Sequence, residues 1–277
     1  MTTSVTGSRR AAIYLWSACW TLLAVAGLSG CATTEPTGMH GSQPDIVTDS
    51  DEPEVRKRAR IRLELAIGYF EQGQTTVALD EIKQALVVDP AYAEAYNLRG
   101  LIYMRLNDLR LAEESFRRAM ALNPRDANVT HNYGWLLCQQ ARYPESFQAF
   151  AQAIANSTYG GRAKTWMAQG LCQTRAGLRA EAEYSLGKSY ELDAANPVTG
   201  YNLAMLLFQR GELARAQFYI RRLNNGEMAN AESLWLGIKI EQRLNNREAV
   251  EQLATQLKKR YPQSREVGSY ERGAFNE

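Results

Sequence analysis

Few residues in this 277-residue chain have side chains suited to chemistry. The chain has four cysteines and only two histidines, His40 and His131, which leaves little material for a metal site or an acid/base centre built on histidine. No glycine-rich phosphate loop, no Ser/His/Asp set and no carboxylate pair stands out. We therefore expect no catalytic residue, no metal, no cofactor and no small-molecule substrate, and an enzyme remains only as an alternative.

Cys31 is the cysteine with the clearest chemical role, because it follows a segment typical of exported proteins. Arg9 and Arg10 precede an uncharged apolar run at 11–28, and the residues at 28–31 read LSGC. This motif resembles the bacterial lipobox, in which the cysteine thiol takes a diacylglycerol group and the peptide before it is removed. A membrane-spanning helix is the alternative, since about 18 apolar residues can just cross a bilayer.

We expect residues 1–30 to be a lipoprotein signal peptide and Cys31 to carry the lipid anchor. The next residue is Ala32, not the aspartate that retains many such lipoproteins in the inner membrane. The expected location is therefore the periplasmic face of the outer membrane, with the lipid as the contact to the membrane.

Removal of the signal peptide also changes the charge balance. The whole chain has 32 basic and 30 acidic residues, and both charges in residues 1–30 are arginines. The mature chain is thus formally neutral. This argues against nucleic acid as a partner, because such proteins need a basic face on a basic domain.

The remainder divides by composition into a tether, a folded domain and a tail. Residues 31–52 are rich in Thr, Pro, Gly and Ser, and such a segment buries too little apolar surface to offset the entropy of ordering. We expect a flexible tether there, a folded domain at 53–263, and a loosely ordered tail at 264–277.

The folded domain repeats itself with a period near 34 residues, which is the length of a tetratricopeptide repeat. One unit precedes residues 93–126 and four follow them. The unit at 93–126 shows the pattern best. Its matching residues are Tyr96, Gly100, Tyr103, Ala112, Phe116, Ala119 and Pro124. The pattern predicts an all-α fold, a right-handed α-solenoid superhelix of about six tetratricopeptide repeats. An ordinary helical bundle is the alternative.

In such an array the first helix of each unit lines a concave face that binds partners. Counting positions along the first three units predicts a mixed apolar and polar groove, suited to an extended segment of another protein. For Ile67, Phe70, Leu101 and Met104, packing against a neighbouring helix is the alternative. The expected groove residues are Leu63, Ile67, Phe70, Asn97, Leu101, Met104, His131 and Trp135.

Two segments, NYGWLLCQQ at 132–140 and GLC at 170–172, make the chain resemble the PilW/PilF lipoproteins of type IV pilus biogenesis. The lipobox and the six repeats agree with this resemblance. It implies a pilotin, an outer-membrane lipoprotein that binds the secretin subunit and promotes its localisation and multimerisation. A tetratricopeptide lipoprotein that serves β-barrel assembly, or that recruits cell-wall enzymes, is the alternative function.

Cys138 and Cys172 lie in equivalent stretches of the first helices of adjacent units, 34 residues apart. First helices of adjacent units lie side by side, so we expect a disulfide between these residues in the oxidising periplasm. The alternative is that both are small buried hydrophobic side chains.

Overall fold

The computed structural model describes residues 51–275, and within them it contains thirteen helices and no strand. The expected signal peptide, Cys31 and nearly all of the expected tether lie outside the described residues. The helices are α1 (Glu54–Glu71), α2 (Thr75–Val88), α3 (Ala93–Arg105), α4 (Leu109–Leu122), α5 (Ala127–Gln139), α6 (Tyr143–Ala155), α7 (Arg162–Arg175), α8 (Arg179–Leu192), α9 (Pro197–Gln209), α10 (Leu213–Asn224), α11 (Ala231–Arg243), α12 (Arg247–Arg260) and α13 (Arg265–Glu271).

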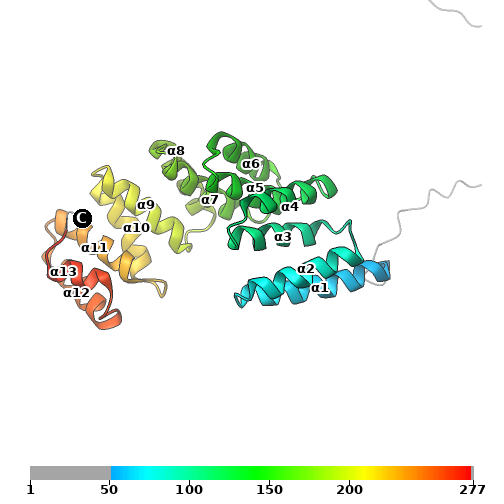
Figure 1. Cartoon of the computed structure of the whole chain (residues 1–277). Helices are drawn as coiled ribbons and strands as arrows, with labels where there is room; N and C mark the ends of the chain where they lie inside the picture. Colours follow the sequence, from blue (N-terminus) through cyan, green and yellow to red (C-terminus); the bar gives the residue numbers. More distant parts are fainter. Residues whose placement is uncertain (1–50, 276–277) are drawn as a thin grey trace, which may run out of the picture. The chain divides into compact units, whose positions relative to one another are not determined.

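The first twelve helices form six helical hairpins that follow one another in the order of the sequence (Figure 1). Each turn inside a hairpin contains one residue with a positive φ, which reverses the chain sharply after the first helix. Glycine takes this position at Gly73, whereas Ala141 adopts φ 58° in the third hairpin. The all-α solenoid of repeats that the sequence predicts is therefore confirmed.

The small residue in the middle of each first helix allows the two helices of a hairpin to pack closely. A Cβ atom added to Gly100 would lie 2.5 Å from the Phe116 ring on α4, and one added to Gly170 would lie 2.6 Å from Cγ of Leu186 on α8. Phe116 and Leu186 are completely buried. The glycines of the repeat pattern are thus required by large core side chains of the second helix.

The odd-numbered and even-numbered helices lie on different sides of the stack. From α1 to α11, each odd-numbered helix contacts the next odd-numbered helix, whereas the even-numbered helices of the described part make no such contact with one another. Helices crowd together on the inner side of a curved stack and separate on its outer side. The first helices therefore line the concave face, as a tetratricopeptide array requires.

The segment after Ser264 corrects one expectation. Residues 265–271 form α13, which is not a loosely ordered tail: Ser264 caps the helix through its side chain, and Val267 is buried against α11 and α12. The Phe275 ring packs on Trp235, with ring centroids 5.5 Å apart. These few apolar side chains cover the last repeat, whose hydrophobic face would otherwise meet water.

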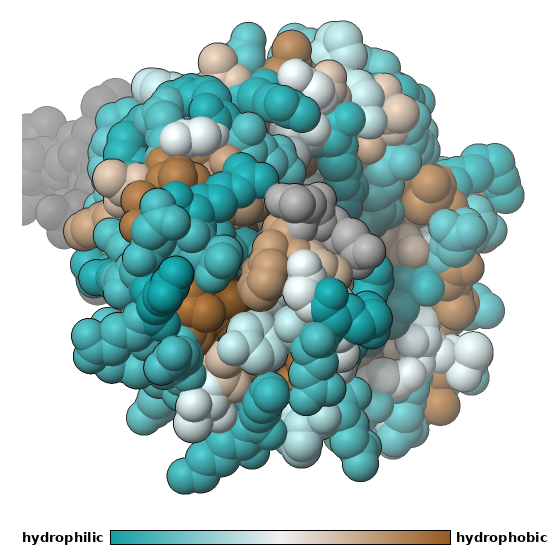
Figure 2. Space-filling model, turned by 90° about the vertical axis from the view of Figure 1, so that its left-hand side faces the viewer, coloured by the Kyte–Doolittle hydropathy of each residue, from teal (hydrophilic) through white to brown (hydrophobic). Residues whose placement is uncertain are grey.

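The end of the array that faces the viewer in Figure 2, on the side of α12 and α13, is covered mostly by hydrophilic side chains. Hydrophobic side chains show there only in small separate areas. This polar outer surface is typical of the capping element of a repeat array. None of the helices in residues 51–275 has both the length and the apolar character needed to cross a bilayer.

Candidate partner-binding face

The concave face contains a hollow of about 240 Å³ between α3, α5 and α7. Its walls are mainly apolar, and one lysine lies at its edge. The lining residues are Leu101, His131, Asn132, Trp135, Lys164, Met167, Ala168 and Leu171. Three of the eight residues expected in the groove, Leu101, His131 and Trp135, are therefore brought together in one place.

His131 forms part of the floor of this hollow and is not an open groove residue. Its side chain is buried, its Nδ1 lies 2.9 Å from the Thr165 hydroxyl on α7, and its ring is 5.9 Å from that of Phe150. Burial, together with the nearby positive charge of Lys164, lowers the pKa of His131 from 6.5 to about 4. The imidazole is therefore neutral at physiological pH, and it joins α5 to α7.

Leu63 is also buried, and its expected place in the open groove is wrong. Its side chain is only 7% exposed and packs in a core cluster with Leu98 and Ile102 of α3. Leu63 and His131 share the fifth position of their repeats, which points toward the next first helix. The ninth position is more open, because Ile67 on α1 is 40% exposed.

The remaining expected groove residues are half-buried contacts between neighbouring first helices. The Arg105 guanidinium lies 3.7 Å from the centre of the Phe70 ring. Asn97 accepts a hydrogen bond of 2.9 Å from the Asn132 side-chain amide, and Met104 packs against the core cluster of the second repeat. These residues lie on the expected face, but each side chain also packs against or hydrogen-bonds a neighbouring helix and is therefore only partly exposed.

The groove expected from the sequence covers only the first three units and therefore leaves out the α7 side of the hollow. The same count in the fourth unit selects Lys164, Met167 and Leu171, all of which line the hollow. The fourth unit also supplies Arg175, whose guanidinium lies 4.8 Å from the centre of the Trp135 ring.

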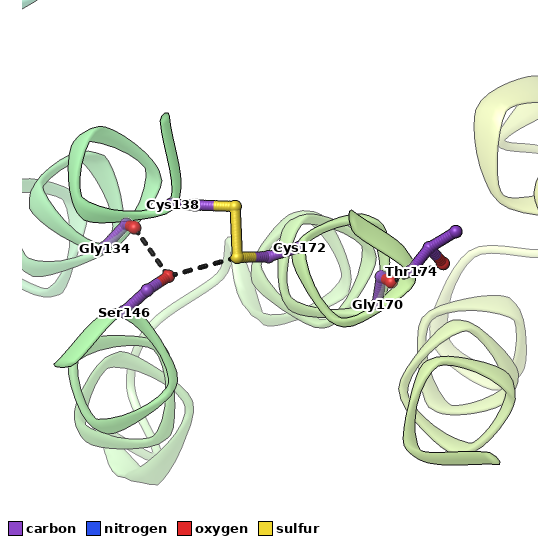
Figure 3. Close-up of a disulfide and its surroundings, with 6 residues drawn as sticks. All are labelled: Gly134, Cys138, Ser146, Gly170, Cys172 and Thr174. Carbon is purple, nitrogen blue, oxygen red and sulfur yellow. Dashed lines mark hydrogen bonds between the residues drawn. A yellow bond between two sulfur atoms is a disulfide. The ribbon is translucent and has the colours of Figure 1, made fainter. Parts of the chain in front are cut away.

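Cys138 and Cys172 share a core cluster with Ala168 and Trp135, which line the hollow. They are joined by a disulfide in the structure, with Cα atoms 5.9 Å apart. Figure 3 shows the Ser146 hydroxyl between the Gly134 carbonyl and the Cys172 sulfur. The hydroxyl donates to the carbonyl over 2.8 Å and lies 3.5 Å from the sulfur. The bond therefore ties α5 to α7, while Ser146 on α6 contacts both.

This arrangement offers a surface for binding. Among residues 51–275 no group of three or more His, Cys, Asp or Glu side chains is placed to hold a metal ion. The features of the face are an apolar hollow, half-exposed aromatic rings and a few cations.

The repeats define the class of the protein. The family model for the tetratricopeptide repeat matches residues 63–127 and 100–161, and the six hairpins with their inner row of first helices have the architecture of this scaffold family.

The comparison with known proteins also identifies the family within this class. The chain is 31% identical over 250 residues to the type IV pilus assembly protein PilF of Pseudomonas aeruginosa, covering 90% of this chain and 95% of that protein. The solved structure of P. aeruginosa PilF matches with a TM-score of 0.71 and 28% identity, over 80% of this chain and 100% of that one. That of PilW, a widely conserved type IV pilus biogenesis factor, matches with a TM-score of 0.70 and 30% identity, over 79% and 99%. The chain belongs to the PilF/PilW-like family of tetratricopeptide-repeat proteins.

Proposed function

We propose that this protein is a pilotin of type IV pilus biogenesis. It binds the secretin subunit through the concave face and promotes the localisation and multimerisation of the secretin in the outer membrane. Acyl chains on Cys31 hold it at the periplasmic face of that membrane. It acts by binding and not by catalysis.

The observation that carries the proposal is the match to the pilus assembly protein PilF along nearly the whole length of both proteins. The hollow between α3, α5 and α7 supports it, because an apolar concavity with a few polar groups is suited to a side chain of a bound segment. The lipid anchor rests on the lipobox-like motif that ends at Cys31. Several acyl chains on one residue give stable attachment, where a single chain is marginal.

A pull-down from detergent-solubilised outer membranes, with the lipidated full chain as bait, tests the proposal. Secretin should be recovered with the wild-type chain. Recovery of β-barrel assembly components or cell-wall enzymes in place of secretin would instead support the alternative scaffold function and overturn the pilotin assignment.

A further inference from the structure

The central part of the concave face has an unusual charge distribution. The three neighbouring first helices α5, α7 and α9 contain no aspartate and no glutamate over their full lengths. Their charged residues are Arg162, Lys164 and Arg175, all on α7. This stretch of the face therefore carries only positive charge.

Several arginines of the second helices and the turns beside them are in a different situation, because they are paired with glutamates. Glu113 on α4 binds Arg142 at 2.9 Å and Arg117 at 2.7 Å. Glu183 on α8 binds Arg210 at 2.6 Å and also pairs with Arg215. Glu113 and Glu183 thus neutralise arginines of the second helices and turns, and do not neutralise the cations of the first helices.

Arg175 has no carboxylate within ion-pair distance among residues 51–275, and neither has Lys164. Both side chains are exposed. The Arg175 guanidinium lies over the Trp135 ring, and a guanidinium in such a cation–π contact can still donate N–H groups to a carboxylate. The same arrangement recurs two repeats further on, where Arg243 lies 4.4 Å from the centre of the Phe208 ring.

Lys164 and Arg175 lie toward opposite ends of the hollow. Lys164 is in the first turn of α7 and lines the hollow, whereas Arg175 is in the last turn and covers Trp135, which lines it too. They are eleven positions apart on the helix, which corresponds to about 16 Å at 1.5 Å per residue. An extended peptide covers that distance in about five residues.

We propose that the α7 side of the concave face binds an extended acidic segment of the protein partner, with an apolar side chain in the hollow and a carboxylate on each side of it. One carboxylate meets Lys164 and the other meets Arg175, about five residues apart. This inference rests on the proposed function, since it describes the segment that the secretin would present. Charge complementarity selects the occupant, because an acid-free face with two unpaired cations attracts carboxylates and repels basic segments.

A synthetic peptide tests this directly. It carries two glutamates about five residues apart around a central phenylalanine, with glycine and serine elsewhere. Its binding to the full chain in detergent is followed by fluorescence anisotropy. The double variant Lys164→Glu/Arg175→Glu should bind this peptide at least about tenfold more weakly, because each contact becomes a like-charge pair. Lys83→Glu, which reverses an exposed lysine on α2, is the matched control and should bind as the wild type does.

The glutamine version of the peptide should bind wild type about as weakly as the glutamate version binds the double variant. Equal binding of both peptides to wild type, or unchanged binding by the double variant, overturns the proposal. A dimer of the full chain that the double variant dissociates also overturns it, because the occupant of the face would then be a second copy.

The pull-down separates this inference from the proposed function. If the double variant recovers as much secretin as wild type, the acidic-segment inference is overturned while secretin binding stands. If wild type recovers no secretin but binds the acidic peptide in a charge-dependent way, the pilotin assignment fails and the chemistry of the face is supported.

Discussion

Cys138 on α5 and Cys172 on α7 lie on the first helices of neighbouring repeats, and the disulfide between them joins these two helices. Both side chains are buried, at 2% and 0% exposure. Because α5 and α7 form two walls of the hollow, this bond constrains the part of the face that we assign to partner binding.

We expect mass analysis of non-reduced, alkylated protein from the periplasm to show Cys138 linked to Cys172. Replacing both with serine should lower the free energy of unfolding by about 3 to 4 kcal/mol, since the unfolded chain regains the freedom of a loop of about 34 residues. Urea denaturation with and without reductant measures this. Two fully alkylatable thiols in native material would show that the bond does not form in the cell.

The neutral, buried imidazole of His131 predicts a pH dependence of stability. Its pKa is about 4 in the folded protein and about 6.5 in the unfolded chain. The unfolded chain therefore binds a proton first as the pH falls, and stability is lost progressively between these two values, by up to about 3 kcal/mol. Above pH 6.5 the residue is neutral in both states and has no such effect.

His131→Gln keeps a polar partner for the Thr165 hydroxyl but does not titrate. Its urea midpoint should therefore fall less than that of wild type between pH 6.5 and pH 4. Parallel curves for the two proteins would mean that other groups cause the loss of stability.

The surroundings of two helix glycines, one closely packed and one open, predict opposite effects for two glycine-to-alanine changes. Gly100→Ala places a methyl group 2.5 Å from the buried Phe116 ring, and such overpacking costs about 1 to 3 kcal/mol. Gly187 on α8 has no heavy atom within 4 Å of an added Cβ. Gly187→Ala should therefore stabilise the protein by about 0.5 to 1 kcal/mol through helix propensity. Thermal denaturation checks both, and destabilisation by the second change would show that the helix does not tolerate a side chain there.

The sequence predicted the repeats well because their pattern records contacts inside one hairpin. Gly100 and Phe116 belong to the same unit, so the steric reason for the small residue repeats with the unit. The repeated pattern also predicts correctly that the first helix of each unit lies on the concave side of the stack. Helix α13 was missed because its stability comes from Val267 and Phe275 packing on the sixth repeat, and no repeated pattern records contacts made once.

The groove was predicted less well, because position counting does not distinguish a side chain directed into the groove from one directed at the next helix. Leu63 is covered by α3, and His131 is held by Thr165 from α7. The residues that cover Leu63 and His131 come from the next repeat, about 34 residues further along the chain. Only the packed structure therefore shows which groove positions are covered.

The anchor prediction concerns a residue outside the described part of the chain. Cys31→Ala removes the thiol that would accept the lipid, so the exported variant should be released from the outer membrane into the soluble periplasmic fraction. Cell fractionation and immunoblotting measure this. If the variant stays with the outer membrane at unchanged yield in a strain that lacks the secretin, the anchor hypothesis is wrong.

The open and buried positions of the first two units predict separate effects on binding and stability. Ile67 is 40% exposed on α1 and Leu101 lines the hollow, whereas Leu63, one turn before Ile67, is only 7% exposed. Truncating a central apolar contact commonly weakens binding by about 2 kcal/mol or more. We therefore expect Ile67→Ala with Leu101→Ala to reduce secretin recovery and piliation, with helical content and melting temperature close to wild type.

Two single variants serve as controls for this pair. Leu63→Ala should lower the free energy of unfolding by about 2 kcal/mol or more, as emptied core positions do. Val87→Ala removes an 82% exposed side chain on α2, away from the concave face, and should change neither binding nor stability by a measurable amount. The outcome that contradicts the prediction is a double variant that recovers secretin like wild type while its stability falls as far as that of Leu63→Ala. Ile67 and Leu101 would then contribute to the core alone, and the secretin would bind at another part of the concave face, the nearest candidate being the α7 side around Lys164 and Arg175.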